Sequence, residues 1–505
     1  MPVGRIAFAL AAVAGAAGAC VGLLGEWRSP LNPDAAWILY CAGRVLDGAR
    51  LYRDIVEINP PLVFWLNLPV VGAARLTGLS EVLVFRLVVV LLAIASLGLS
   101  ARLLPLAWRG GSRLGPLAVL VALSAVLLPM PAGYFGQREH LTLALVVPYL
   151  FTAAAEAQGQ PPSRGLRVTA GLAAALGFAL KPHFLVVWAG VILYGWAREG
   201  RRYRWLGAIN LTIALGLAAY GIVVLVASRE YLGIVSALGG AYQRFAAHPV
   251  LAIMTRGSLP LSVLATLVAY LAFRRIVSEQ IFADHLAVAA AGFLLAVVLQ
   301  GKGFGYHYLV AIGASVLLLV TVLFARSERG GPLLRATAVV CTTLVLVGTL
   351  WPFLHSTIRR ARGILSPVDA AMLEVAGVVR SRAAGQPIAV LSPRLADAFP
   401  LVLYSGTRWA SRLPNLWCIQ SVAAESPVER WCVGSVGEDL ERQRPALVLV
   451  RRWSPEGPAD LRFDFVAPLR ADPRFTREFG WYEPVESVAD FVMYRRRVSA
   501  GTTTR

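Results

Sequence analysis

Charged residues are scarce in this 505-residue chain: 15% of its residues are Asp, Glu, Lys or Arg, against 57% that are hydrophobic. This balance excludes an ordinary soluble protein, in which about a quarter of the residues are charged. Apolar runs of roughly 17 to 25 residues recur over residues 1–355, and a helix of that length crosses the hydrocarbon core of a bilayer. The sequence therefore predicts a polytopic α-helical membrane protein.

Lysine is almost absent, because the chain has 46 arginines and only two lysines, Lys181 and Lys302. Each lysine lies at the end of a predicted span. A lysine that snorkels to the membrane interface is one explanation. Arginine would snorkel equally well, so a lysine at these two positions favours a need for a compact point charge, such as one that contacts a phosphate.

Cysteine is also scarce, and the five cysteines show no metal-ligand spacing. Cys418 and Cys432 share a polar region, where they form either a disulfide or two free thiols. The sequence lacks a Gly-rich phosphate loop after a strand and a Ser/His/Asp order typical of hydrolases. The net charge of +19 falls mainly in residues 1–362, which hold 30 Lys and Arg against 13 acids. Short basic loops of this kind set membrane orientation, so no nucleic-acid partner is expected.

The spacing of apolar runs and basic loops predicts about 11 transmembrane helices in residues 1–355. Basic loops stay in the cytoplasm, which places the N-terminus inside and a first outer loop, residues 25–80, outside. The N-terminal apolar run is interpreted as a retained anchor, and a signal peptide is its alternative. Pro182 is predicted to break residues 168–197 into a short helical hairpin.

An odd number of crossings puts the C-terminal part, residues 356–505, on the outer side. Its segments at residues 386–392, 445–453 and 490–497 have the pattern of strands, and residues 368–385 have the pattern of a helix that ends on glycine. We therefore expect a C-terminal extracytoplasmic α/β domain. The sequence shows no internal repeat of the kind found in many transporters.

The loops expected on the outer side carry most of the polar residues that could do chemistry. Because these loops emerge at one face of the membrane, we expect their side chains to gather there. The candidates are Asp34, Glu57, Asn59, Arg138, Glu139, His140, Lys181, Arg244, His248, Lys302, Tyr306 and His307.

Asp34 follows Asn-Pro at the start of a predicted surface helix that ends at the Asp47-Gly48 turn. Its simplest role is that of an N-cap. Its functional role would be that of a general base, since a carboxylate at the membrane edge is partly desolvated and accepts a proton more readily. Glu57 is either an ordinary solvated loop acid or a substrate ligand, and Asn59 precedes a stiff Pro-Pro pair.

Two further stretches carry candidate ligands. In GYFGQREHL, Glu139 either favours a helix N-terminus or, with His140, positions an acceptor hydroxyl or holds a divalent cation, which leaves that cofactor open. In GKGFGYHY, two glycines free the backbone, while Lys302, Tyr306 and His307 supply donors suited to an anionic oxygen.

An enzyme on the outer face has no nucleotide sugar available, so an activated donor must arrive attached to the membrane. A polyprenyl-phosphate sugar fits, with its phosphate at the interface. The reaction needs a base on the acceptor hydroxyl and cations on the leaving phosphate. We assign Asp34 to the first role and Lys302 to the second. Lys181, His307 and Arg138 would also bind the phosphate, and the remaining candidates would contact substrate.

Asp34, together with GARLYRDIVEINPPLVFWL from Gly48 onward, resembles the first outer loop of the GT-C glycosyltransferases. Within that group the stretch looks like the dolichyl-phosphate-mannose protein mannosyltransferase-like family and the related lipid A aminoarabinose transferases. The resemblance implies that Asp34 is the base, that Pro60-Pro61-Leu62 is the family's PPL segment, and that the anomeric carbon is inverted. Asn59 stands where relatives often have lysine, so phosphate binding would fall to Lys302 or Lys181.

These observations together predict a glycosyltransferase of the bacterial inner membrane, with the N-terminus cytoplasmic and the C-terminal domain periplasmic. Its partners would be a polyprenyl-phosphate sugar donor, membrane lipids, and an envelope glycan, lipid or protein acceptor. The alternatives are a ligase or polymerase of lipid-diphosphate-linked glycans, which needs more cations, and a lipid or sugar transporter, which needs ionisable residues in mid-span. A third alternative makes the C-terminal domain a sensory or docking module.

Overall fold

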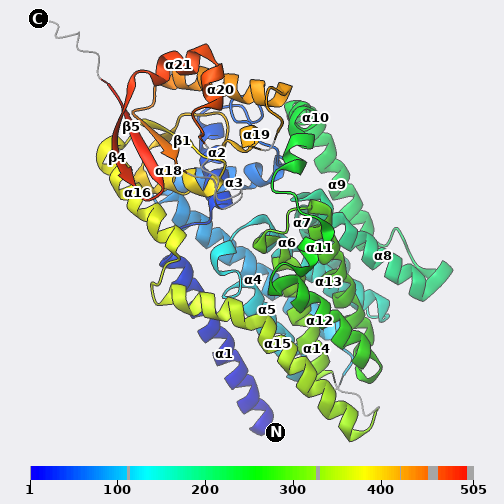
Figure 1. The fold of residues 1–505 in the computed structure, drawn as a ribbon. Coiled ribbons are helices and arrows are strands. Elements are labelled where there is room, and N and C mark those ends of the chain that lie inside the picture. The colour runs from blue at the N-terminus through cyan, green and yellow to red at the C-terminus, as the bar shows by residue number, and fades with distance from the viewer. Residues whose placement is uncertain (1, 111–113, 326–329, 421, 453–463, 498–505) are drawn as a thin grey trace, which may run out of the picture. The chain divides into compact units, whose positions relative to one another are not determined.

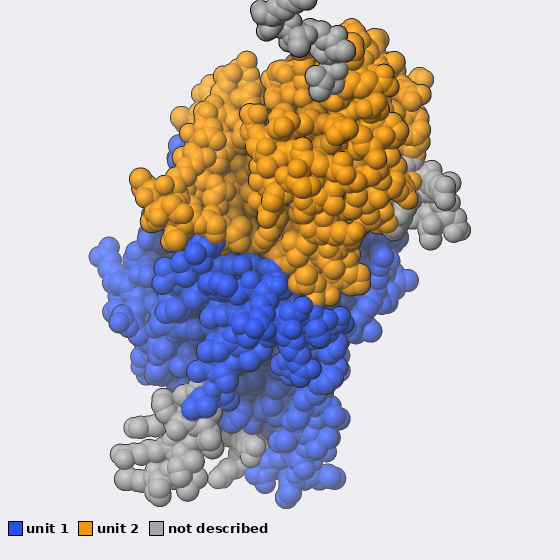
Figure 2. All heavy atoms as spheres, turned by 90° about the vertical axis from the view of Figure 1, so that its left-hand side faces the viewer, with its two compact units in different colours: residues 1–29, 83–223, 248–364 blue, residues 30–82, 224–247, 365–505 orange. Residues whose placement is uncertain are grey.

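The computed structural model describes residues 2–110, 114–325, 330–420, 422–452 and 464–497. The chain divides into two compact units, which Figure 2 shows in separate colours. Unit 1 contains residues 1–29, 83–223 and 248–364, and unit 2 contains residues 30–82, 224–247 and 365–505. The C-terminal part of unit 2 thus begins near the expected boundary at residue 356, but the first loop and residues 224–247 belong to the same unit.

Unit 1 is a bundle of apolar helices, drawn from blue to yellow-green in Figure 1. Its helices, some of which extend by a few residues into unit 2, are α1 (Pro2–Trp27), α4 (Glu81–Ala107), α5 (Leu114–Leu127), α6 (Arg138–Ala157), α7 (Arg164–Ala179), α8 (Leu185–Glu199), α9 (Ala208–Ala227), α11 (Val250–Thr255), α12 (Ser258–Phe273), α13 (Gln280–Gln300), α14 (Leu309–Phe324) and α15 (Pro332–Ala361). Short 3-10 turns join them: η1 (Ala132–Tyr134), η2 (Pro182–Phe184), η3 (Gly200–Arg202), η4 (Arg274–Ile276) and η5 (Gly305–Tyr308).

Among the described residues, seven helical segments are long and apolar enough to cross a membrane. The 11 expected spans all coincide with helices, but α5, α7 and α8 have only 14, 16 and 15 residues. Residues 250–273 form two helices, α11 and α12, which are separated at Gly257, whose φ is +85°. The break at Pro182 between α7 and α8 agrees with the prediction.

The centre of unit 1 is formed by α6, α13 and α14. In the segment Gly305–Phe324, which contains α14, 89% of the residues in the most apolar stretch are buried. In α15 the same share is 17%. Helix α14 is therefore a core helix and α15 a peripheral one. Glycine permits the close approach of these helices, because a Cβ on Gly313 would lie 2.4 Å from Leu143. Asp284 on α13 accepts hydrogen bonds from Tyr194 and Tyr270, at 2.7 and 2.5 Å, and thereby ties α8 and α12 to α13.

Unit 2 combines the first loop with the C-terminal α/β segment. Its helices are α2 (Pro33–Leu46), α3 (Leu62–Thr77), α10 (Arg229–Arg244), α16 (Pro367–Ala383), α17 (Leu395–Ala398), α18 (Leu401–Ser405), α19 (Trp417–Gln420), α20 (Pro427–Gln443) and α21 (Pro473–Phe479), with one 3-10 turn, η6 (Pro468–Ala471). Its strands are β1 (Pro387–Leu391), β2 (Arg408–Trp409), β3 (Leu447–Arg451), β4 (Tyr482–Val488) and β5 (Phe491–Arg496).

The five strands form one mixed sheet in the order β2-β1-β3-β5-β4. The pairs of β1 with β2 and β3 are parallel, and the pairs of β5 with β3 and β4 are antiparallel. All five residues of β3 are buried, as expected for a central strand. The three strands and the helix predicted from the sequence are confirmed as β1, β3, β5 and α16. Sequence reasoning missed the very short β2 and the half-exposed β4.

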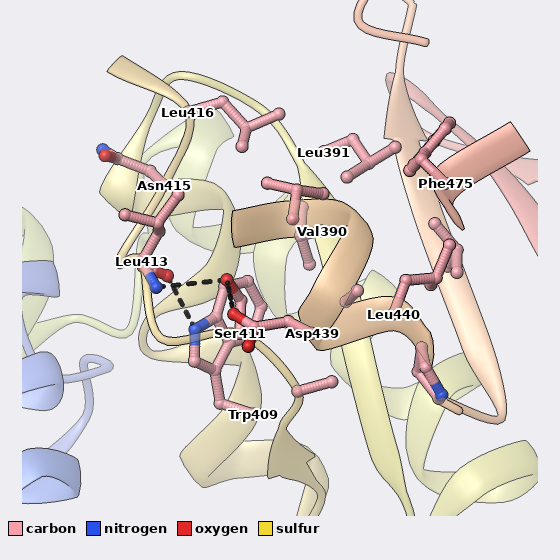
Figure 3. Close-up of a pocket in the computed structure, with 15 residues that line it drawn as sticks. Val390, Leu391, Trp409, Ser411, Leu413, Asn415, Leu416, Asp439, Leu440 and Phe475 are labelled. Atoms are coloured by element: carbon pink, nitrogen blue, oxygen red, sulfur yellow. Dashed lines mark hydrogen bonds between the residues drawn. The ribbon is translucent and has the colours of Figure 1, made fainter. Parts of the chain in front are cut away.

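A small cavity in unit 2 lies between the sheet and helices α20 and α21 (Figure 3). Apolar side chains such as Val390, Leu440 and Phe475 line it, and Trp409 Nε1 closes one side by donating to the Leu413 carbonyl at 2.9 Å. Its volume of about 20 Å³ accommodates roughly one water molecule. This cavity is therefore a packing defect of the core and is too small to hold a substrate.

Cys418 and Cys432 form a disulfide with Cα atoms 6.3 Å apart, which decides between the two alternatives left open by the sequence. It joins α19 to α20 next to the core of unit 2, where both cysteines are fully buried.

Replacing Cys418 and Cys432 with serine should lower the stability of unit 2 by about 3 kcal/mol, because the crosslink restricts the unfolded chain. Limited proteolysis of the purified chain, with fragments assigned by mass spectrometry, measures this loss. Cys341→Ser on α15 is the control, since Cys341 is a free cysteine of unit 1. Equal protease resistance in the double variant and the control would show that the crosslink does not stabilise unit 2.

Candidate functional site

Polar side chains gather in unit 1 where α6 begins, α7 ends and α13 ends. We call this set the cationic cluster and define it as Arg138, Glu139, Lys181, Gln300, Lys302, Tyr306 and His307. The turn before α6, the break between α7 and α8, and the loop from α13 to α14 bring these residues together. The interior of the apolar helix bundle cannot solvate charge, so these charged side chains lie at the ends of the helices.

Lys181 is the centre of the cluster. Its ammonium donates hydrogen bonds to the Glu139 carboxylate and to Gln300 Oε1, the latter at 2.9 Å, and it lies over the Tyr306 ring, 5.4 Å from the centroid. Lys181 is 7% exposed, and Glu139 is fully buried. A charge buried to this degree is stable only when it is paired and hydrogen-bonded. Lys181 is therefore held in place and is not a lysine that snorkels toward water.

His307 lies within electrostatic range of three cations. Lys181, Arg138 and Lys302 all lie close enough to His307 to act on it electrostatically. Arg138, Lys302 and His307 are 6%, 6% and 3% exposed. Within the cluster as defined, these three cations face a single carboxylate, that of Glu139. Its net charge of two positive favours an anion such as a phosphate.

The loop that carries Lys302 depends on two glycines. Gly301 and Gly303 have φ values of +71° and +61°, a region that costs other residues free energy. Tyr306 then contacts His307 edge-to-face, with ring centroids 4.5 Å apart, and Phe304 contacts the same histidine at 5.4 Å. The rings of Phe304 and Tyr306 therefore pack against His307 and fix its orientation. The expected role of Lys302, Tyr306 and His307 as donors to an anionic oxygen stays a prediction from the sequence.

His183, in the turn between α7 and α8, extends the same electrostatic environment. Burial lowers the pKa of His183, and the positive charges of Lys181 and Arg138 lower it further. At neutral pH this side chain is uncharged, so its neutral imidazole adds a hydrogen-bonding group and no charge. We include His183 as an edge residue of the site.

The His140 side chain binds backbone groups of its own unit through both ring nitrogens. Its Nδ1 accepts from the Gly136 amide at 3.0 Å, and its Nε2 lies 2.8 Å from the Leu127 carbonyl, so both ring nitrogens are engaged by backbone. Among the described residues, no group of three or more His, Cys, Asp or Glu side chains is arranged to hold a metal ion. The proposed substrate and metal roles of His140 stay predictions from sequence.

His248 lies beside the loop that carries Lys302. Its backbone amide donates to the Gly301 carbonyl at 2.8 Å, and its Nε2 accepts from Arg256 at the same distance. His248 therefore connects the segment before α11 to the glycine loop. Arg244, by contrast, is exposed at the end of α10 in unit 2.

In unit 2, Asp34 lies in the first turn of α2. The N-cap of this helix is Asn32, whose Oδ1 accepts from the Ala35 amide at 2.9 Å. The interpretation of Asp34 as the N-cap is therefore wrong, because the helix begins at Pro33 and the capping side chain comes from the residue before it. Asp34 is half-buried. The helix ends at Leu46 with Asp47 as C-cap, as predicted.

Glu57 organises the loop that precedes the Pro-Pro pair. Its Oε2 accepts from Trp37 Nε1 at 2.6 Å, and its Oε1 accepts from the amides of Ile58 and Asn59 and from the Asn59 side chain. Glu57 is buried, so the alternative of an ordinary solvated loop acid is wrong. Both oxygens already bind donors of the protein, and these bonds fix Asn59 next to Pro60.

Sequence reasoning missed Gln300 and Trp37. Gln300 is a polar residue at the end of an otherwise apolar run, and that contrast was a signal for a role beside Lys302. Trp37 gave no signal, because its indole donor reaches Glu57 only after the chain folds back over 20 residues.

The pairing of Lys181 with Glu139 makes a prediction about stability. Lys181→Met should cost about 3–5 kcal/mol, because it leaves a fully buried carboxylate without its cation. The double variant Lys181→Met/Glu139→Gln should recover most of that loss, since no uncompensated charge remains. Thermal unfolding of the detergent-purified variants measures the coupling. If the losses of the two single variants simply add, the pair does not act as one unit.

Comparison with solved structures identifies proteins that share the fold of this chain. No protein-family model matches the chain, and no curated protein sequence matches it either. Among solved structures, it is similar to ArnT from Cupriavidus metallidurans bound to undecaprenyl phosphate, with a TM-score of 0.57, 13% identity, and coverage of 97% of this chain and 99% of that chain. The apo structure of the same ArnT gives a TM-score of 0.51 at 14% identity, with 96% and 97% coverage. The predicted resemblance is therefore confirmed at the level of the fold, which is that of the GT-C glycosyltransferases.

Proposed function

We propose that this chain is a membrane glycosyltransferase that transfers one sugar from a polyprenyl-phosphate donor to an acceptor on the outer face of the membrane. The observation that carries the proposal is that three buried cations, Arg138, Lys181 and Lys302, lie within electrostatic range of one histidine, His307, at the ends of apolar helices. Such a site suits a ligand with an apolar tail and an anionic head. A phosphate attached to an isoprenoid chain has both properties.

The fold likeness supports this class of donor. ArnT, with which the chain shares its fold over nearly the full length, has been solved with undecaprenyl phosphate bound. At 13% identity the likeness alone assigns no substrate. Together with a buried cluster of net positive charge, it favours a polyprenyl phosphate over a soluble donor. The sugar and the acceptor are left open.

The chemistry assigns a role to each group. The acceptor oxygen attacks the anomeric carbon, the bond from that carbon to the phosphate oxygen breaks, and its electron pair leaves with the polyprenyl phosphate. The acceptor proton passes to a base, which we assign to Asp34 on the basis of the sequence. The leaving phosphate gains negative charge, which Lys302, Lys181 and Arg138 stabilise. A single displacement inverts the anomeric carbon.

The same features weigh against a transporter. A transporter needs ionisable residues along the middle of its spans. The core helix α14 carries none between Leu309 and Phe324. Arg86 lies in the second turn of α4, where it donates to the Ser29 carbonyl at 2.6 Å. The glycan ligase or polymerase stays an alternative that a donor assay separates, because its donor carries a diphosphate.

The disulfide supports an extracytoplasmic location for unit 2. Disulfides persist in the periplasm and outside cells but are rare in the cytoplasm. Cys418 and Cys432 are joined, whereas Cys41 in the same unit is a free, buried thiol. We therefore propose a periplasmic placement, in a bacterial inner membrane, for the part of unit 2 that carries the disulfide.

Lys302→Gln should raise the KM for a polyprenyl-phosphate sugar by about tenfold or more, because it removes a cation from the phosphate. Steady-state transfer from a radiolabelled donor in detergent measures this change. The matched control is Arg359→Gln, an exposed cation at the end of α15. A KM that stays within about twofold of the unmodified value would remove Lys302 from donor binding.

Asp34→Asn should lower kcat by about 100-fold or more while leaving donor affinity within a few-fold, because the loss of a general base affects the chemical step. Asp54→Asn is its control, since Asp54 is a partly exposed acid of the same loop. Transfer rates at saturating donor, with donor binding measured separately, give both quantities. Near-normal turnover of Asp34→Asn excludes Asp34 as the base. Absence of transfer from every polyprenyl-phosphate sugar tested would refute the proposed function itself.

A further inference from the structure

A second cavity lies in unit 1, at the end of α6, α7 and α8 that is opposite to the cationic cluster. Its volume is about 450 Å³, and Glu156 near the end of α6, Arg167 near the start of α7 and Glu199 at the end of α8 line it. A helix of twenty residues such as α6 is about 30 Å long. The cavity therefore lies far from the cationic cluster, and the two share no residue.

The interior of this cavity contains a buried hydroxyl without a partner. Tyr149 on α6 is 1% exposed, and its Oη makes no hydrogen bond within the described part of the chain. Its ring is fixed edge-to-face against Phe178, with centroids 5.9 Å apart. A buried polar atom that stays unsatisfied is costly, so this hydroxyl indicates a ligand or water in the cavity.

Further donors point to the same space. Asn210 Nδ2 donates to Tyr203 Oη at 3.2 Å, which leaves the Tyr203 hydroxyl hydrogen available to a ligand. Both residues line the cavity. The Tyr203 ring packs directly on α8, because a Cβ at Gly195 would lie 2.3 Å from it. The absence of a side chain at Gly195 thus leaves room for the Tyr203 ring.

The mouth of the cavity is basic and aromatic. Three arginines, Arg167, Arg202 and Arg204, line the cavity against two carboxylates, those of Glu156 and Glu199, and Glu156 already pairs with Arg167 at 3.5 Å. Trp205 contacts the ring of Tyr203, which lines the cavity, with centroids 5.6 Å apart, and Trp196 lies 6.3 Å from Trp205; the two tryptophans are 48% and 49% exposed. Exposed tryptophans are typical of the membrane interface, which favours a cavity mouth at the depth of lipid headgroups.

We infer that this cavity binds the phosphate headgroup of a membrane lipid. Arg202 and Arg204 would contact the phosphate oxygens, and the hydroxyls of Tyr149 and Tyr203 would donate to the polar part of the headgroup. The volume suits a headgroup, since small-ligand sites span roughly 300–1,000 Å³. This inference does not depend on the proposed function, because none of these residues belongs to the cationic cluster.

The test uses the full chain, purified and delipidated in detergent, with phosphatidylglycerol added. Native mass spectrometry should show one lipid that binds saturably. Arg202→Gln/Arg204→Gln should raise its Kd by about tenfold or more, and Tyr149→Phe by about threefold or more, because each removes donors to the headgroup. Tyr149→Phe keeps the ring that packs on Phe178, so its fold should be unchanged. Arg201→Gln is the control, since Arg201 is exposed in η3 and does not line the cavity.

Glycerol phosphate forms a second arm, because it carries the same phosphate chemistry without acyl chains. Competition by glycerol phosphate only at concentrations at least about 100-fold higher supports a lipid ligand. Equal competition by glycerol phosphate would overturn the lipid as the ligand. If Arg201→Gln weakens binding as much as the double variant, or if Tyr149→Phe has no effect, the lipid is held by diffuse charge on the loop and the proposed site is refuted.

Discussion

The cost of burying charge in an apolar bundle is the constraint on which the site of this protein depends. Lys181 has almost no contact with water, and Glu139 has none. Such groups are retained only when they are paired, so the Lys181 ammonium, Glu139 Oε1 and Gln300 Oε1 fix one another. That mutual fixation positions Lys181 next to Tyr306 and His307. A cluster built this way is ordered before any ligand arrives, which reduces the entropy lost on binding.

Unit 2 obeys the same rule with the opposite charge. The buried Glu57 carboxylate gathers four donors, among them Trp37 Nε1 and the amide of Asn59. The carboxylate anchors the loop, because it accepts hydrogen bonds from two backbone amides, those of Ile58 and Asn59, and from two side-chain donors, Trp37 Nε1 and Asn59 Nδ2. In each unit, one buried charged side chain therefore fixes the conformation of a polar segment, which the pattern of apolar residues does not determine. In the first loop, this anchor sets the backbone that leads into Pro60 and Pro61.

The two ends of unit 1 offer different chemistry, although the same helices build both. At one end, α6 and α7 present Arg138 and Lys181 in a set with net positive charge. At the other, they present Tyr149 and Arg167 around a cavity that opens beside exposed tryptophans. Antiparallel helices make this division natural, since each helix contributes its first turn to one end and its last turn to the other. Unit 1 thus has two separate polar regions, the cationic cluster at one end and the second cavity at the other.

The sequence by itself determined the apolar, helical character of the chain, the positions of the apolar helices, the strands β1, β3 and β5, and which loops carry polar residues. These features follow from the local periodicity of apolar residues and from the length of apolar runs, which must match the hydrocarbon thickness of a bilayer. Only the tertiary structure decided that Glu57 is an anchor, that Asn32 and not Asp34 caps α2, that Lys181 pairs with Glu139, and that Cys418 bonds to Cys432. Each of these facts depends on which distant groups share a buried space. Burial and partner choice are properties of packing, and no local pattern in the chain encodes them.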